Sequence, residues 1–271
     1  MSIVRRLSLK FLGVENRGNS TLPSLLAQNF LKKLGIGSSS PIFQKMRTMY
    51  RNLGSHISLS RSYSFNGEDS VIARYLPEAA GSYLDIGSGH PTRGSNTFLF
   101  YKRGWTGITI DPLKKIHRLQ QIRRRRDRQI NACIGTPEDL NQSVTFYKYI
   151  ADDFSTTSEN RYLELLKRGI VPVSILKLPM IRINELQLVA SPIDPFFLDI
   201  DIEGNEFEVL KSNDWSKFTP RVIAIEEWNS PVYKPTQIRL YLEKFGYILD
   251  SRTVITSIYV HQEYLATAQF I

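Results

Sequence analysis

The segment at residues 83–90 constrains the fold of this chain more than any other. It reads Tyr-Leu-Asp-Ile-Gly-Ser-Gly-His, so an apolar run typical of a buried strand leads directly into a Gly-x-Gly turn. A second apolar run, residues 108–110, ends in Asp111, about 20 residues beyond that turn. Glycines let the backbone approach a ligand closely, and an acid at this spacing can bind both hydroxyls of a ribose. The pattern predicts an α/β fold with a site for an adenosine-bearing cofactor.

The same segment departs from the dinucleotide-binding fingerprint at Thr92. In Gly-x-Gly-x-x-Gly the third glycine, here Thr92, allows tight packing of helix on strand beneath a pyrophosphate. Its absence disfavours a diphosphate ligand and leaves S-adenosylmethionine, which carries adenosine without phosphate, as the expected cofactor. A purely structural interpretation stays open, in which Asp85 caps a helix and Asp111 begins an Asp-Pro turn.

Length and composition suit one large α/β domain with an extension. The chain has 271 residues, of which 42% are hydrophobic. Its single cysteine, Cys133, excludes an internal disulfide and a cysteine-based zinc site. The sequence has no apolar run near the roughly 20 residues that span a bilayer, and its N-terminus does not resemble a signal peptide. We therefore expect a cytoplasmic protein.

Positive charge is concentrated in residues 1–60. This part holds nine basic residues and one acid, so it supplies nearly all of the formal net charge of +9. Apolar residues recur at helical spacing from Leu22 to Leu34, and Gly35 suits a helix stop. We expect a basic, partly helical arm at residues 1–60 and the main domain at residues 61–271. The helix of the arm either packs on the main domain or contacts a partner or an anionic membrane, peripherally at its inner face.

A run of four arginines occupies residues 123–126 within an expected helix at residues 117–128. Such a run can bind phosphate or nucleic acid. Because no interleaved aromatic residues or nucleic-acid motif accompany it, we interpret it as a solvated helix face and expect no nucleic-acid partner.

Apolar runs and turn residues divide the main domain into alternating strands and helices. The expected strands are residues 83–86, 107–110, 129–134, 144–149, 196–201 and 221–226. The expected helices are residues 69–76, 95–103, 117–128, 235–245 and one that begins at residues 206–210. Residues 152–158 are expected to form a loop, and residues 246–250 and 254–260 a terminal hairpin around residues 251–253.

Motifs between residues 63 and 259 resemble those of the FkbM family of S-adenosylmethionine-dependent methyltransferases. They include Tyr-Ser-Phe-Asn-Gly-Glu-Asp at 63–69, Leu-Asp-Ile-Gly-Ser-Gly-His-Pro at 84–91, Ser-Asn-Thr at 95–97, Arg-Gly-Trp-Thr-Gly-Ile at 103–108 and Ile-Asp-Pro at 110–112. The most distinctive is Leu-Asp-Ile-Asp-Ile-Glu-Gly-Asn-Glu at 198–206. The chain departs from the family at Phe65 and Asn66, where many relatives have a glutamine and a variable residue.

The resemblance implies a Rossmann-like class I methyltransferase fold, a doubly wound, mostly parallel sheet ending in an antiparallel hairpin, here with a helical N-terminal extension. It also implies O-methylation, often of sugar hydroxyls in polysaccharides, glycolipids or glycosylated metabolites. Residues 131–135 resemble the part of the family that faces the adenine. The expected cofactor-binding residues are Glu68, Asp85, Gly87, Ser88, Gly89, Asn96, Asp111, Ala132, Cys133 and Asp199.

Carboxylates near the expected strand end at residue 201 are the catalytic candidates. Side chains alternate along a strand, so Asp199, Asp201 and Glu203 are expected on one side of it. One of them could act as general base for a sugar hydroxyl, or they could bind Mg2+, and Glu203 could instead cap the next helix. Glu226 ends the next strand and is also a catalytic candidate, with Glu227, His90 and His261 as weaker ones.

Two other classes of function stay open. An NAD-dependent sugar oxidoreductase is disfavoured by Thr92 and by the terminal hairpin, which is unusual for a nicotinamide-binding domain. A non-catalytic, membrane-associated adaptor would use the arm, but the acids of the predicted site are all present.

Overall fold

The computed structural model describes residues 62–136, 143–188, 196–228 and 234–267. The expected arm at residues 1–60 lies outside the described residues, so its helix stays a prediction. No helix within these four ranges is long and apolar enough to cross a membrane.

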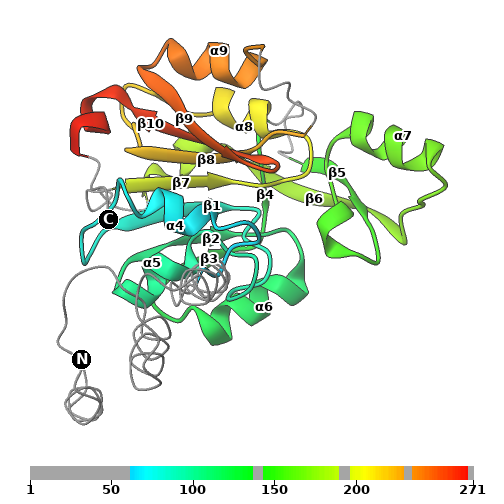
Figure 1. Ribbon diagram of the computed structural model, residues 1–271. Coiled ribbons are helices and arrows are strands. Elements are labelled where there is room, and N and C mark those ends of the chain that lie inside the picture. The colour runs from blue at the N-terminus through cyan, green and yellow to red at the C-terminus, as the bar shows by residue number, and fades with distance from the viewer. Residues whose placement is uncertain (1–61, 137–142, 189–195, 229–233, 268–271) are drawn as a thin grey trace, which may run out of the picture. The chain divides into compact units, whose positions relative to one another are not determined.

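Buried apolar runs form the centre of a seven-stranded sheet in the order β3-β2-β1-β7-β8-β10-β9. The strands are β1 (Ser82–Ile86), β2 (Thr106–Ile110), β3 (Arg128–Ile130), β7 (Phe196–Ile200), β8 (Val222–Glu226), β9 (Tyr247–Thr253) and β10 (Thr256–His261). The first five strands in this order, β3, β2, β1, β7 and β8, are parallel to one another. Strand β10 is antiparallel to both β8 and β9. The predicted doubly wound sheet with a terminal hairpin is confirmed (Figure 1).

The order of the strands places a switch point between β1 and β7. From β1 the chain runs outward through β2 to β3, and it later returns to the other side of β1 as β7. In open α/β sheets ligands bind at the carboxyl ends of the strands that flank such a point. In register, Asp85 pairs with Asp199 and Ile86 with Ile200, so both strands end at the same edge.

Successive side chains of the central strands pack against helices on opposite faces of the sheet. Leu84 and Leu198 belong to one buried cluster with residues of α8 (Glu206–Lys211) and α9 (Gln237–Glu243). Tyr83 and Phe197 belong to another with residues of α4 (Glu68–Ile72) and α5 (Phe98–Arg103). The sheet is therefore covered on both faces, as a nearly continuous apolar strand requires.

A second, three-stranded sheet extends from the main sheet. It consists of β4 (Cys133–Ile134), β6 (Ser174–Ile181) and β5 (Ser143–Lys148), with β5 antiparallel to β6. Between β5 and β6 the chain forms the short helices η1 (Asp152–Phe154) and α7 (Glu159–Lys167). We call residues 143–181 the β5–β6 lobe. Figure 1 shows it beside the main sheet, with α7 at its outer side.

Several expected boundaries are wrong. The helices expected at residues 69–76 and 95–103 are the shorter α4 (Glu68–Ile72) and α5 (Phe98–Arg103). The expected strand at residues 129–134 is two strands in different sheets, because β3 ends at Ile130 and β4 pairs with Met180 and Ile181 of β6. The expected helix at residues 117–128 is α6 (Lys114–Arg123), which ends earlier because Arg124 leaves helical geometry. The turn of the hairpin lies at residues 254–255 rather than 251–253, and its Val254 and Ile255 carry no turn signal.

Candidate active site

A pocket of about 410 Å3 lies at the carboxyl edge of β1, β2, β7 and β8, at the switch point. Most of the predicted site residues line it, namely Gly87, Ser88, Gly89, Asp111, Ala132, Cys133, Asp201, Glu203 and Glu226. A more open hollow of about 550 Å3 beside α8 contains none of the predicted site residues.

The glycine turn after β1 requires its glycines. Gly87 has φ 80°, and a Cβ there would lie 1.7 Å from the carbonyl oxygen of Asp201. Gly89 has φ 50°, but a Cβ there would meet nothing closer than 3.9 Å, so this part of the turn borders open space. The backbone N–H groups of Gly87 and Ser88 donate to Ile110 at 2.9 and 3.1 Å, which ties the turn to β2. The backbone therefore approaches the pocket closely and is held in place.

Asp111, at the end of β2, faces the same turn. Its carboxylate accepts hydrogen bonds from the N–H groups of Leu113 at 2.8 Å and Gly89 at 3.2 Å. Burial raises the pKa of Asp111 to about 7, although these two hydrogen bonds favour its ionised form. Each oxygen retains acceptor capacity toward the pocket, as the binding of ribose hydroxyls requires.

An apolar wall lies next to Asp111. It is formed by Leu113, Ala132, Cys133 and Phe146, all of which line the pocket. Cys133 is 4% exposed, and burial raises the pKa of its thiol to about 12. The thiol is therefore neutral and is not suited to act as a nucleophile. The apolar wall suits contact with the flat face of the adenine ring.

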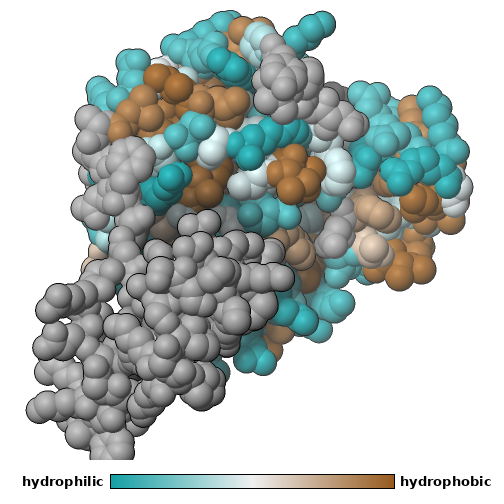
Figure 2. Space-filling view, viewed as in Figure 1, coloured by the Kyte–Doolittle hydropathy of each residue, from teal (hydrophilic) through white to brown (hydrophobic). Residues whose placement is uncertain are grey.

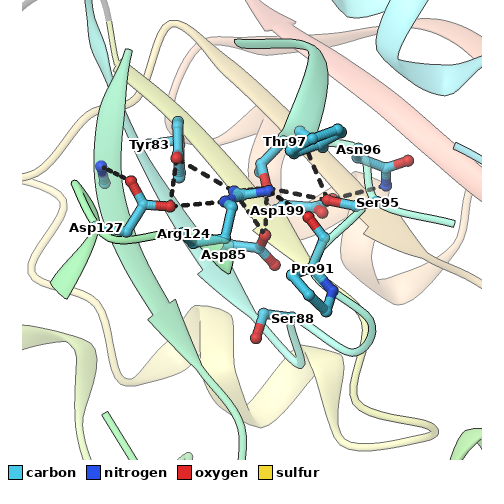
Figure 3. A network of polar contacts seen from close by, with 12 residues as sticks. Tyr83, Asp85, Ser88, Pro91, Ser95, Asn96, Thr97, Arg124, Asp127 and Asp199 are labelled. Atoms are coloured by element: carbon cyan, nitrogen blue, oxygen red, sulfur yellow. Dashed lines mark hydrogen bonds and ion pairs between the residues drawn. The ribbon is translucent and has the colours of Figure 1, made fainter. Parts of the chain in front are cut away.

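Four predicted cofactor residues do not line the pocket, namely Glu68, Asp85, Asn96 and Asp199. Asp85 accepts a hydrogen bond from Thr97, and Asp199 accepts one from Asn96 at 3.0 Å. Glu68 accepts hydrogen bonds from Asn66 and Thr253. All three acids are buried and already engaged with protein partners. Figure 3 shows the contacts of Asp85 and Asp199, which support the pocket floor.

Arg124 organises this floor, and the sequence analysis missed it. Its side chain is fully buried, whereas the arginine run was predicted to be a solvated face. The guanidinium donates to Asp127 at 2.8 Å, to Thr97 at 2.7 Å and to the carbonyl of Pro91 at 3.0 Å, and it lies 4.0 Å from Asp85 (Figure 3). Because Pro91 follows the glycine turn, Arg124 fixes that turn from below.

Gln120, one turn earlier on α6, supports the glycine turn in the same way. Its side-chain amide donates to the hydroxyl of Ser88 at 3.1 Å and to the carbonyl of Gly89 at 3.0 Å. The sequence carries no local signal for either contact, because a polar helix residue usually faces water.

An acidic cluster forms the other end of the pocket. Carboxylate oxygens of Asp201, Glu203 and Glu226 lie within 4.8 Å of one another. Strand β7 ends at Ile200, so Asp201 and Glu203 lie in the following loop, where Glu203 has φ 61°. The expected grouping with Asp199 therefore differs, because Asp199 points beneath the pocket and Glu226 of β8 completes the cluster.

Glu226 differs from its neighbours in protonation. It is 4% exposed, and burial together with the charges of Asp201 and Glu203 raises its pKa to about 10. At neutral pH it is therefore a carboxylic acid hydrogen-bonded to Asp201. Asp201, in contrast, is exposed to solvent.

Arg161 of α7 reaches the cluster from the β5–β6 lobe. Its guanidinium lies 3.6 Å from the carboxylate of Glu203 and 5.4 Å from the ring centre of Trp228. Thr156, also in the lobe, donates to the carbonyl of Glu203 at 2.7 Å. Neither α7 nor these contacts were predicted.

The N-cap of α8 is Asn205, so Glu203 does not take the capping role considered for it.

The weaker candidates have structural partners. His90 lines the pocket, but its Nδ1 accepts the N–H groups of Thr92 and Arg93, and burial lowers its pKa, so it is neutral. Glu227 accepts hydrogen bonds from Thr236 and Tyr259. His261 packs against Tyr247 and does not line the pocket.

The strand order, the glycine turn and the acid after β2 define a Rossmann-like fold with a site for a nucleoside-bearing cofactor. The sequence model of the Methyltransferase FkbM domain matches residues 85–249. This match covers more than half of the chain, which therefore belongs to the FkbM methyltransferase family and is an S-adenosylmethionine-dependent methyltransferase.

Solved structures similar to this chain carry methyltransferase descriptions. A protein from Haemophilus influenzae described as a methylase is 16% identical, with a TM-score of 0.36, covering 72% of this chain and 87% of that one. A TehB-like S-adenosylmethionine-dependent methyltransferase from Corynebacterium glutamicum is 12% identical, with a TM-score of 0.37, covering 80% and 97%. One from Aquifex aeolicus is 14% identical, with a TM-score of 0.33, covering 71% and 88%. No curated protein matches the chain significantly.

Proposed function

We propose that this methyltransferase methylates a hydroxyl of a sugar in a polysaccharide, glycolipid or glycosylated metabolite. The observation that carries the proposal is the acidic cluster at the end of the pocket opposite the apolar wall. A solvent-exposed Asp201, hydrogen-bonded to a protonated Glu226, is a proton acceptor placed beside the glycine turn.

The residues present fit S-adenosylmethionine. The open space at Gly89 admits the cofactor close to the backbone, and Asp111 retains acceptors for the ribose hydroxyls. Cys133 and Leu113 offer an apolar surface to the adenine. When bound, the cofactor supplies a methyl group already activated by its sulfonium. The protein therefore has to position the acceptor oxygen and receive its proton.

Asp201 and Glu203 are proposed as the reactive edge of the acceptor site. A sugar hydroxyl is a weak nucleophile until its proton leaves, and Asp201 is the accessible carboxylate that can take it. Arg161 holds Glu203 in place through their 3.6 Å ion pair. Glu226 holds Asp201 through its hydrogen bond. In this arrangement Asp201 acts as the base, while Glu226 positions it.

The mouth of the pocket supports a saccharide as acceptor. The side chains of Phe65 and Trp228 line it and are 80% and 48% exposed. Exposed aromatic rings beside polar groups suit ligands with an apolar face and a hydroxylated edge, and pyranose rings have both. The polar side chains of Arg93 and Thr157 also line the pocket and can bind the remaining hydroxyls.

A magnesium site at the cluster is the second role that the geometry supports. Carboxylate oxygens are the ligands that Mg2+ prefers, and one oxygen of the buried Glu226 has no hydrogen-bond partner. In that case Glu226 would be ionised in the presence of the cation. The two roles predict different behaviour of the same variants.

The experiment measures transfer of labelled methyl groups from S-adenosylmethionine to saccharide acceptors. Asp201→Asn keeps the shape but removes the base, and should reduce turnover at least about a hundredfold while leaving cofactor affinity within a few-fold. Glu226→Gln keeps a hydrogen-bond donor toward Asp201. If Asp201 is the general base, this variant should therefore retain turnover within about tenfold of the wild type. Asp214→Asn, a partly exposed acid that does not line this pocket, is the matched control.

A chelator separates base catalysis from a metal site. Activity that is insensitive to chelation, with an active Glu226→Gln variant, supports base catalysis. Activity lost to the chelator and restored by Mg2+, with an inactive Glu226→Gln variant, supports the metal site. If Asp201→Asn and Glu203→Gln both turn over like the wild type, the cluster has neither role.

A further inference from the structure

The outer end of the β5–β6 lobe exposes a group of apolar side chains. The exposed fractions are 88% for Ile150, 65% for Val171, 54% for Val173 and 57% for Ile175. We call these four residues the apolar tip. Figure 2 shows brown surface bordered by teal on this lobe, at the position of α7, β5 and β6 in Figure 1. Single exposed apolar residues are ordinary, but a group of them on one projection marks a contact surface.

The tip has a defined backbone conformation. Helix α7 ends at Lys167, and Gly169 just beyond it has φ 76°. The N–H of Gly169 donates to Leu166 and that of Ile170 to Leu165, both at 2.9 Å. The N–H of Val173 then donates to the carbonyl of Lys148 at 2.8 Å, which joins the loop to β5. The apolar side chains are therefore held outward on a hydrogen-bonded projection.

Exposed basic residues lie near the tip in the sequence. Lys167, Arg168 and Lys177 are exposed, and residues 165–181 contain no acid. Glu164, on the preceding turn of α7, is paired with Arg161 and Arg168. Asp152, two residues after Ile150, is paired with Lys115. Apolar side chains beside exposed cations are complementary to an anionic lipid surface, since the former enter the interface and the latter bind headgroups.

We propose that the apolar tip docks this methyltransferase on an anionic membrane surface. A second copy of the chain fits the tip less well, because a symmetric contact would bring the same lysines together. The lobe that carries the tip also forms one wall of the pocket through Phe146, Ser155 and Thr157. Docking would therefore hold that wall close to acceptors anchored in the membrane. The proposal does not rest on the reaction proposed above, because lipid binding is measured without turnover.

Flotation of the full-length chain with vesicles tests this proposal. The probes are phosphatidylcholine vesicles with and without about 30% phosphatidylglycerol, since each basic residue near an anionic leaflet contributes measurably to binding. The double variant Val171→Ser and Val173→Ser should lower affinity for anionic vesicles roughly tenfold. The double variant Lys167→Gln and Lys177→Gln should lower it by a similar factor and leave binding to neutral vesicles unchanged. All four side chains are exposed, so thermal unfolding should shift little.

Matched controls come from other surfaces. Leu240→Ser on α9, where the side chain is 50% exposed, and Lys102→Gln on α5 should bind vesicles like the wild type. The proposal is overturned if the tip variants also bind anionic vesicles like the wild type. That result would mean that residues 1–60 supply all of the affinity for the vesicles. It is equally overturned if light scattering shows that the serine variant turns a dimer into a monomer while its vesicle binding is unchanged.

Discussion

Replacing Asp111 by asparagine tests the cofactor site at the residue whose contacts are best defined. The carboxylate accepts N–H groups of Gly89 and Leu113, and asparagine would turn an N–H2 group toward one of these donors. It would also weaken a charge-assisted hydrogen bond to the ribose, which contributes about 1.5–3 kcal/mol. The dissociation constant for S-adenosylhomocysteine should therefore rise roughly tenfold to 150-fold.

The pH dependence of binding gives an independent check on Asp111. Burial raises its pKa to about 7, so acidification from pH 8 to pH 6 protonates the group that binds the ribose. Wild-type affinity should fall toward about tenfold per pH unit below 7, and the Asp111→Asn variant should lose this dependence. Because folding raises the pKa, the stability contributed by Asp111 is present at low pH and is lost as the pH rises through 7. Unfolding driven by this group therefore cannot mimic the loss of affinity.

Isothermal titration calorimetry with S-adenosylhomocysteine measures both effects. Asp214→Asn, at a partly exposed site outside the pocket, is the control for loss of one negative charge. Two results would contradict the role of Asp111 at the ribose. One is binding of S-adenosylhomocysteine by Asp111→Asn within a few-fold of the wild type at pH 8, and the other is a wild-type affinity that does not change between pH 8 and pH 6. Tight binding of NAD with no binding of S-adenosylhomocysteine would contradict the cofactor assignment itself.

Two further predictions concern the pocket floor and the arm. Arg124→Leu leaves Asp85 and Asp127 buried without their cation, so urea unfolding should show a loss of about 3–5 kcal/mol, and a loss below about 1 kcal/mol would contradict the supporting role of Arg124. For residues 1–60 we propose binding to anionic membranes. In the full-length chain, Lys32→Gln with Lys33→Gln should reduce vesicle affinity, by about 1 kcal/mol per lysine, and binding should weaken with added salt. Unchanged vesicle binding combined with a destabilised main domain would instead support packing of the arm on that domain.

The strands that build the site could be predicted from sequence because their signals are local. Residues 83–86 and 221–226 are apolar runs that end at a glycine turn or an acid, and they match β1 (Ser82–Ile86) and β8 (Val222–Glu226) within one residue at each end. The pocket residues Gly87, Gly89 and Asp111 follow from the same signals, because the turn and the strand ends fix their positions.

The rest depends on contacts between segments that are distant in sequence. Arg124 is buried because Asp85, Thr97 and Pro91 receive its guanidinium, and nothing in its own run of arginines indicates this. In strand β6 half of the side chains are exposed, with no clear alternation, so its pairing with β5 determines its structure. Likewise Glu226 joins Asp201 because β8 lies beside β7 in the sheet, whereas Asp199 is drawn beneath the pocket by Asn96.

The most direct test of the account combines methyl transfer with the Asp201→Asn variant. Purified full-length chain would be incubated with methyl-labelled S-adenosylmethionine and saccharide or glycolipid acceptors, and the products located by mass spectrometry and NMR. We predict label in a methyl ether on a sugar oxygen, formed by the wild type and reduced at least about a hundredfold by Asp201→Asn, with cofactor binding preserved. Label on nitrogen, carbon or a non-sugar oxygen, or undiminished transfer by Asp201→Asn, would contradict the account.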